Sequence, residues 1–106
     1  MSAEISIEDL KTIDLKEVNS LCSKNNINTR IDDYTKRKFD MALRTAYLLI
    51  TQPIEIAISR QTKIDSVNSL KDIKKVLDSL YLITKDKKYK NFIDEINELI
   101  SHGKLK

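Results

Sequence analysis

Three of the four arginines stand at seven-residue intervals, and this is the spacing in the sequence that most suggests chemistry. They are Arg30, Arg37 and Arg44, and on a helix this interval would align them along one face. A guanidinium group donates two parallel hydrogen bonds to a phosphate, and Lys36 and Lys38 add positive charge beside the row. One hypothesis is therefore direct DNA or RNA binding through Arg30, Lys36, Arg37, Lys38 and Arg44.

The same arginines also fit an ordinary solvated helix face. Asp33 precedes Arg37 by four positions, and Asp40 precedes Arg44 by four, so each of these arginines has an acidic neighbour at the intrahelical spacing. The formal net charge of +3 is too small to imply a polyanionic partner by itself, and the first 20 residues are acidic. We therefore favour an ion-paired surface over a nucleic-acid interface.

Three isoleucines at two-residue steps follow Pro53. In any single helix Ile54, Ile56 and Ile58 cannot all face one core, so at least one should be available to a partner protein or a second copy of the chain. The alternation is also typical of a strand, but no second alternating run could pair with it. We therefore expect residues 53–60 to be helical, with the proline in the first turn, and predict Ile54, Ile56 and Ile58 as partner-binding residues.

Other reactive residue types have structural explanations. His102, the only histidine, lies at the carboxyl-terminal end of the last predicted helix, where it is best explained as a helix-end cation. Cys22 shares an apolar face with Val18 and Leu21 and has no activating base nearby, so we expect a buried thiol. The only glycine, Gly103, cannot build a phosphate-binding loop. We therefore predict no catalytic residue, no metal site and no cofactor, and a protein that is not an enzyme.

The elements that must position these residues are helices. One glycine and one proline in 106 residues leave few turn signals. Apolar residues recur at three- and four-residue steps, and Tyr89 and Phe92 follow this period, so we expect both rings in the core. Gly103 should cap the last helix in a left-handed conformation. The predicted helices are a short one near 7–12, then 15–24, a third from within 32–35 to Pro53, a fourth capped by Ser66 or Ser69 and ending near 84, and a last one over about 89–100.

Short connections between these helices favour antiparallel neighbours. We therefore predict an all-α fold, a compact bundle of four to five antiparallel helices, in a single domain over residues 1–106 whose first 14 residues are partly flexible. A single cysteine permits no intramolecular disulfide, and no apolar run approaches the roughly 20 residues of a membrane span. We expect an intracellular protein without membrane association, cytoplasmic, or nuclear if its source is eukaryotic.

Residues 53–70, PIEIAISRQTKIDSVNSL, carry a resemblance that covers less than a fifth of the chain. This stretch is similar to the middle of the helical domain at the amino terminus of transcription elongation factor S-II and related proteins. Asp65 stands where that family usually has glycine, and the family's later tryptophan is absent. The resemblance implies a helical bundle that docks short motifs of transcription partners. It rests on Pro53, Ile54, Ile56, Ile58, Thr62, Lys63, Ile64, Val67, Asn68 and Leu70.

The leading functional hypothesis is a small non-enzymatic helical interaction module. It would be a subunit or regulator of a nucleic-acid-handling assembly, in transcription, replication or defence, and would act by protein–protein docking. Direct DNA or RNA binding through the face from Arg30 to Arg44 is the first alternative, and a toxin-neutralising or immunity-type helical protein is the second. The expected partner is another protein or a further copy of this chain, with nucleic acid as the competing candidate.

Overall fold

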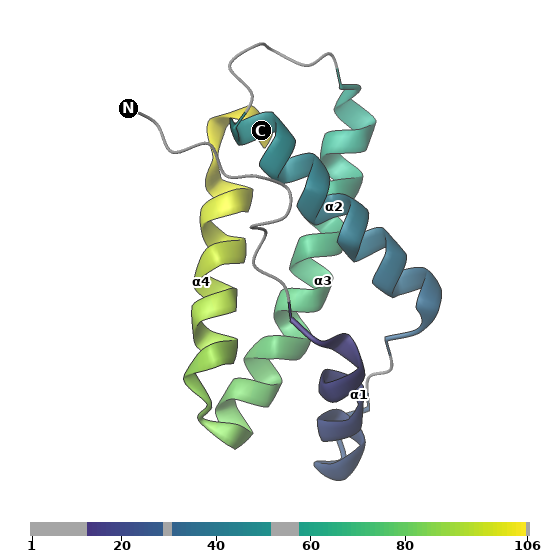
Figure 1. The fold of residues 1–106 in the computed structure, drawn as a ribbon, viewed down its shortest axis with the longest axis vertical. Helices are drawn as coiled ribbons and strands as arrows, with labels where there is room; N and C mark the ends of the chain where they lie inside the picture. Colours follow the sequence, from purple (N-terminus) through teal and green to yellow (C-terminus); the bar gives the residue numbers. More distant parts are fainter. Residues whose placement is uncertain (1–12, 29–30, 52–57, 106) are drawn as a thin grey trace.

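The computed structural model describes residues 13–28, 31–51 and 58–105, and it shows an all-α bundle in which four helices pack together (Figure 1). Figure 1 shows α3 and α4 as an antiparallel hairpin, with α2 crossing α3 obliquely and α1 near the lower end of α3. The predicted fold class is confirmed. The elements are α1 (Leu15–Lys24), α2 (Asp33–Thr51), α3 (Arg60–Thr84), α4 (Lys87–Ser101) and a short 3₁₀ helix, η2 (Gly103–Leu105).

The start of α1 coincides with a side chain that satisfies free backbone amides. Asp14 Oδ1 accepts hydrogen bonds from the N–H of Lys16 at 2.9 Å and from that of Glu17 at 3.4 Å. This agrees with the predicted helix over 15–24. The short helix predicted near 7–12 lies outside the described residues, as does most of the segment 1–14 that we expected to be partly flexible.

The start of α3 corrects two predictions. Ser59 has extended backbone angles (φ −62°, ψ 150°), and its Oγ accepts a hydrogen bond from the N–H of Thr62 at 3.1 Å. The helix is therefore capped by Ser59 and not by Ser66 or Ser69, which lie inside it. The helical segment predicted over 53–60 is wrong at Ile58 and Ser59, which both precede α3; Ser59 is its N-cap, and an N-cap residue is not helical. Residues 53–57 lie outside the described part of the chain.

Two helices are followed by left-handed residues that are not glycine. Asn26, just after α1, has a φ of 58°, and Lys85, at the end of α3, has a φ of 55°. The N–H of Lys85 donates a hydrogen bond to the carbonyl of Tyr81 at 2.9 Å, which satisfies one of the last carbonyls of α3. Asparagine tolerates this conformation well, whereas lysine pays a steric cost for it.

The predicted left-handed cap at Gly103 is wrong. His102 ends α4 with extended backbone angles (φ −67°, ψ 136°), and Gly103 begins η2 with a negative φ. The physical reason lies at Leu105, which is only 4% exposed. By continuing into a 3₁₀ turn, the chain carries this leucine into the core, and burial of a leucine contributes about 1.5–3 kcal/mol.

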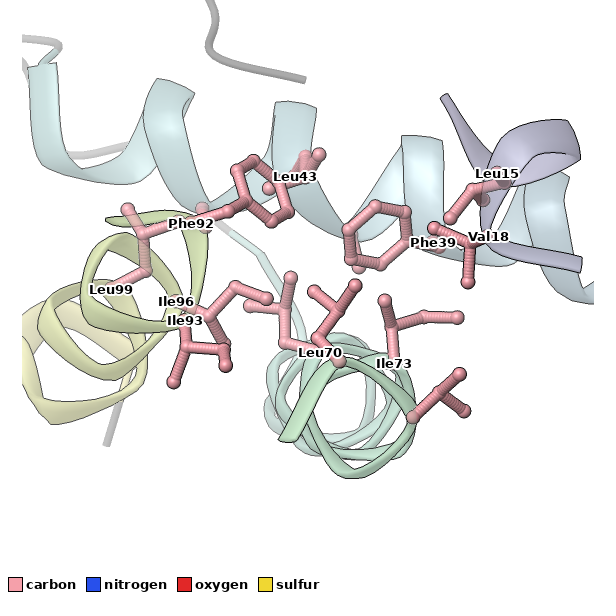
Figure 2. Close-up of a cluster of buried hydrophobic side chains, with 14 of the residues drawn as sticks. Leu15, Val18, Phe39, Leu43, Leu70, Ile73, Phe92, Ile93, Ile96 and Leu99 are labelled. Carbon is pink, nitrogen blue, oxygen red and sulfur yellow. The ribbon is translucent and has the colours of Figure 1, made fainter. Parts of the chain in front are cut away.

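Apolar side chains from all four helices meet in one core (Figure 2). Phe39 of α2 and Phe92 of α4 contact each other edge to face, with ring centroids 6.1 Å apart. Tyr89 and Phe92 are both buried, as the helical period predicts. The largest fully buried side chains are Val18 and Cys22 of α1, Phe39 of α2, Leu70, Ile73, Leu77 and Leu80 of α3, and Tyr89 and Ile96 of α4.

Candidate docking groove

The basic residues predicted to contact nucleic acid lie on α2, except Arg30, which is outside the described residues. Arg37 and Arg44 are exposed and share one face of the helix two turns apart, while Lys38 is exposed and Lys36 half-buried. The ammonium of Lys38 lies 5.4 Å from the centroid of the Tyr34 ring, in a cation–π contact.

The intrahelical ion pairs that offered a simpler explanation of these arginines are not formed. Among the described residues, neither Asp33 with Arg37 nor Asp40 with Arg44 makes an ion pair; those in the structure are Lys88 with Glu17 and Asp86, and Lys90 with Asp94. Arg37 and Arg44 therefore present their charges to solvent. Nucleic-acid binding by this face stays a prediction.

Of the three isoleucines predicted to bind a partner, only Ile58 lies in the described part of the chain. Its side chain is half-buried and packs against the core. Ile58 is therefore not the exposed member of the three. Ile54 and Ile56 are outside the described residues, and their role stays a prediction.

The only cysteine and the only histidine of the sequence both make structural contacts. Cys22 is fully buried, and this burial raises the pKa of its thiol, which keeps it protonated and unreactive. His102 Nδ1 accepts a hydrogen bond from the N–H of Lys104 at 3.2 Å, at the start of η2. Within residues 13–28, 31–51 and 58–105, no three histidine, cysteine or acidic side chains converge as metal ligands.

No helix in the described part of the chain combines the length and apolar character needed to cross a membrane.

The structure contains a groove that the sequence motifs did not single out. It lies between the first half of α3 on one side and the end of α4 with η2 on the other, near the upper ends of these helices in Figure 1. Its volume is about 510 Å³, within the usual range of ligand sites. The groove is lined by Arg60, Lys63, Ile64, Val67, Asn68, Lys71, Ile100 and Leu105.

The floor of the groove is apolar. Ile64 is 44% exposed, Val67 and Ile100 are half-buried, and Leu105 is buried beneath them. The lining residues of α3 follow steps of three and four and so form one stripe along the helix. From Arg60 to Lys71 this stripe is about 16 Å long, or three helical turns. The apolar members of this stripe are Ile64 and Val67, and exposed apolar surface of this kind often marks a docking surface.

The rim of the groove is positively charged. Arg60 and Lys71 mark the two ends of the α3 stripe, and Lys63 lies between them. None of these three cations forms an ion pair with another described residue, and none of the described residues that line the groove is acidic. The site therefore combines an apolar floor with positive charge that no acidic side chain of residues 13–28, 31–51 and 58–105 pairs with.

Sequence reasoning missed this site because its two walls are far apart along the chain. Ile100 and Leu105 are partly or wholly buried, and only the packing of α4 and η2 brings them opposite α3. One signal was present in the sequence. Ile64 lies off the apolar stripe that Leu70 and Ile73 define, so a helix through this region must expose it.

Comparisons of this chain with models of protein families, with curated proteins and with solved structures found no match. The resemblance of residues 53–70 to the S-II domain therefore has no independent support. The described residues therefore form a bundle of four helices that carries an apolar groove with a positively charged rim.

Proposed function

We propose that this chain is a non-enzymatic helical docking module that binds a segment of a partner protein in the groove between α3, α4 and η2. The observation that carries the proposal is the convergence of Ile64, Val67 and Ile100 on an open groove of about 510 Å³. A partner that covered Ile64 would remove apolar surface from water, which is the main favourable term in most protein association. The unpaired arginines of α2 support a role within a nucleic-acid-handling assembly, as its subunit or regulator.

The chemistry of the lining favours binding over catalysis. Arg60, Lys63, Lys71 and Asn68 supply positive charge and an amide, and the described residues of the lining include no carboxylate, imidazole or thiol. Acid–base or nucleophilic catalysis needs a reactive group in hydrogen-bond reach of a second one, and no side-chain hydrogen bond joins two of these four residues. The groove residues instead offer contact area and charge.

Site-specific photo-crosslinking in the native host tests the docking role. Ile64 is replaced by benzoylphenylalanine in the full chain, and the matched control carries this residue in place of Leu82, which is also exposed on α3 but far from the groove. We expect a discrete protein adduct at position 64 and none at position 82. The adduct at position 64 should disappear when Val67→Asp is added, and the helical circular dichroism of that variant should show that it is still folded.

Equal adducts at both positions, or none at position 64, would refute a docking role for this groove. The identity of the adduct also separates two forms of the proposal. A component of a transcription or replication assembly would support the regulator role, and a toxin would support the immunity-type alternative.

Direct nucleic-acid binding is a second candidate, which one observation favours. Arg37 and Arg44 are exposed without an ion pair among the described residues, on the same face as Met41, which is 68% exposed. Binding of labelled single-stranded and duplex oligonucleotides, followed from about 50 to 500 mM salt, would weaken steeply if phosphate contacts dominate. The double variant Arg37→Glu/Arg44→Glu should then abolish binding, with Lys87→Glu as the control. Retention of binding by the double variant would eliminate this candidate.

A further inference from the structure

We infer that the partner segment is an acidic amphipathic helix of about three turns, with apolar side chains toward α3 and α4 and carboxylates toward the rim. This inference rests on the proposed function and deepens it by giving the chemical class of the partner. The charge of the groove, its length and the nature of its walls each point to this occupant.

The charge of the rim requires an acidic occupant. Arg60, Lys63 and Lys71 surround an apolar floor, and no described residue pairs with any of them. An apolar segment laid between these cations would partly desolvate them, which is unfavourable unless carboxylates take the place of water. A basic segment would add repulsion to this cost, whereas aspartate and glutamate side chains would form charge-assisted hydrogen bonds.

The walls of the groove favour a helix over an extended peptide. One wall is a side of α3 and the other is the end of α4 with η2, and backbone N–H and C=O groups in the interior of an α-helix are already hydrogen-bonded within it. An extended peptide gains affinity mainly by main-chain pairing with an open sheet edge, and the described residues contain no strand. A helix satisfies its own backbone, and its apolar residues at steps of three and four match the period of the facing α3 stripe.

Peptide binding measured by fluorescence anisotropy tests the inference with the full chain. The first probe is a labelled peptide of about 12 residues, or three helical turns, with leucine on one face and glutamate on the others. The second probe replaces every glutamate by lysine, and the third keeps the composition of the first but scatters the leucines around the helix. We expect micromolar binding of the first probe only, weakening as salt rises.

Reversing the charge of the rim should reverse the preference of the groove, from the acidic probe to the lysine probe. Lys63→Glu/Lys71→Glu should weaken binding of the acidic probe at least about tenfold and create measurable binding of the lysine probe. Ile64→Gln should weaken the acidic probe without reversing the charge preference. Lys87→Glu, an exposed lysine at the opposite end of α4, is the matched control and should change the affinity less than about twofold.

Any one of the following results would overturn the inference. The first is equal binding of the acidic and lysine probes, and the second is an unchanged affinity after the double charge reversal. The third is that vesicles of phosphatidylserine, or a peptide of the chain's own acidic residues 2–12, bind this groove more tightly than the acidic probe. If a protein is crosslinked at position 64 but the acidic probe does not bind, this inference is refuted, whereas the proposed docking function is still supported.

Discussion

The side-chain amide of Asn19 holds the main chain of Ile31 by two hydrogen bonds. Ile31 donates its N–H to Asn19 Oδ1 at 2.8 Å, and Asn19 Nδ2 donates to the carbonyl of Ile31 at 2.7 Å. The amide thus pairs with the backbone as a neighbouring strand would, although the two residues are 12 positions apart. This contact fixes the segment that leads into α2 against α1 and buries Ile31, which is 6% exposed.

Replacing Asn19 should therefore destabilise the fold. Asn19→Ala removes two partly buried hydrogen bonds and leaves both backbone groups of Ile31 without a protein partner, so we expect a loss of about 1–3 kcal/mol in the free energy of unfolding. Urea denaturation followed by circular dichroism measures it. Asn91→Ala, on the exposed face of α4, is the control and should change stability by less than about 0.5 kcal/mol. A similar small effect at both positions would contradict the role of Asn19.

Glycine in place of Lys85 should stabilise the protein. Lys85 is left-handed at the end of α3, where a side chain costs about 1–2 kcal/mol, and glycine removes this cost at some expense in chain entropy. The substitution also removes an exposed cation–π contact between Lys85 and Tyr81, at 5.9 Å. We expect a net gain of about 0.5 kcal/mol for Lys85→Gly and a loss of at least about 1 kcal/mol for Lys85→Val, because β-branched residues avoid this conformation. Thermal and urea unfolding measure the stability of both variants. A glycine variant less stable than the valine variant would contradict this prediction.

Gly103→Ala tests the corrected end of α4. Gly103 has no positive φ, and an added Cβ would meet no atom within 4 Å. Alanine should therefore leave the stability unchanged or raise it by up to about 1 kcal/mol, because it restricts the unfolded chain. The midpoint of urea unfolding is the measurement. A clear loss of stability would indicate the left-handed cap that the sequence pattern predicts and that the structure does not contain.

Tyr47 should make the fold sensitive to alkaline pH. Its hydroxyl donates a hydrogen bond to Glu95 Oε1, and burial first, then this hydrogen bond and the nearby carboxylate charge, raise the pKa of Tyr47 above its usual value. The folded state therefore binds this proton more tightly than the unfolded state does. The resulting stability is complete below about pH 10, the pKa of tyrosine in an unfolded chain, and is lost as the pH rises further.

The variant Tyr47→Phe isolates this effect. It should lower stability at neutral pH by about 1–2 kcal/mol, because Glu95 loses this donor, and should flatten the decline of stability between about pH 9.5 and 11.5. The buried Tyr89, whose pKa is also raised by burial, will retain part of the decline. Urea midpoints across this pH range are the readout, and the exposed Tyr34→Phe is the control. An equally steep decline in Tyr47→Phe would contradict the assignment.

Truncation of Phe39 should be the most damaging single change in the core. The ring is fully buried and packs edge to face on Phe92, so Phe39→Ala removes both its burial and this aromatic contact. We expect a loss of about 3–5 kcal/mol, and a smaller loss for Phe39→Leu, which refills part of the cavity. Met41→Ala, on the exposed face of the same helix, should cost little. Thermal unfolding of the three variants measures this ranking.

Local patterns in the sequence determined the helices and most of the core. The apolar stripes through Phe39, Leu70 and Phe92 predict buried faces, because a helix must hide such a stripe whatever it packs against. The start at Asp14 is equally local, since a capping side chain and the amides that it satisfies are only two or three residues apart. These features need no knowledge of distant contacts.

Tertiary structure decided the features that depend on contacts between distant segments. The burial of Leu105 turned Gly103 into the start of a 3₁₀ helix, whereas the cap of α3 at Ser59 is as local as the one at Asp14. The groove likewise exists only because η2 folds back and sets Leu105 and Ile100 beside Ile64. Periodicity specifies which side of a helix is apolar, but the position of its partner along the chain depends on how the whole set of buried faces packs together.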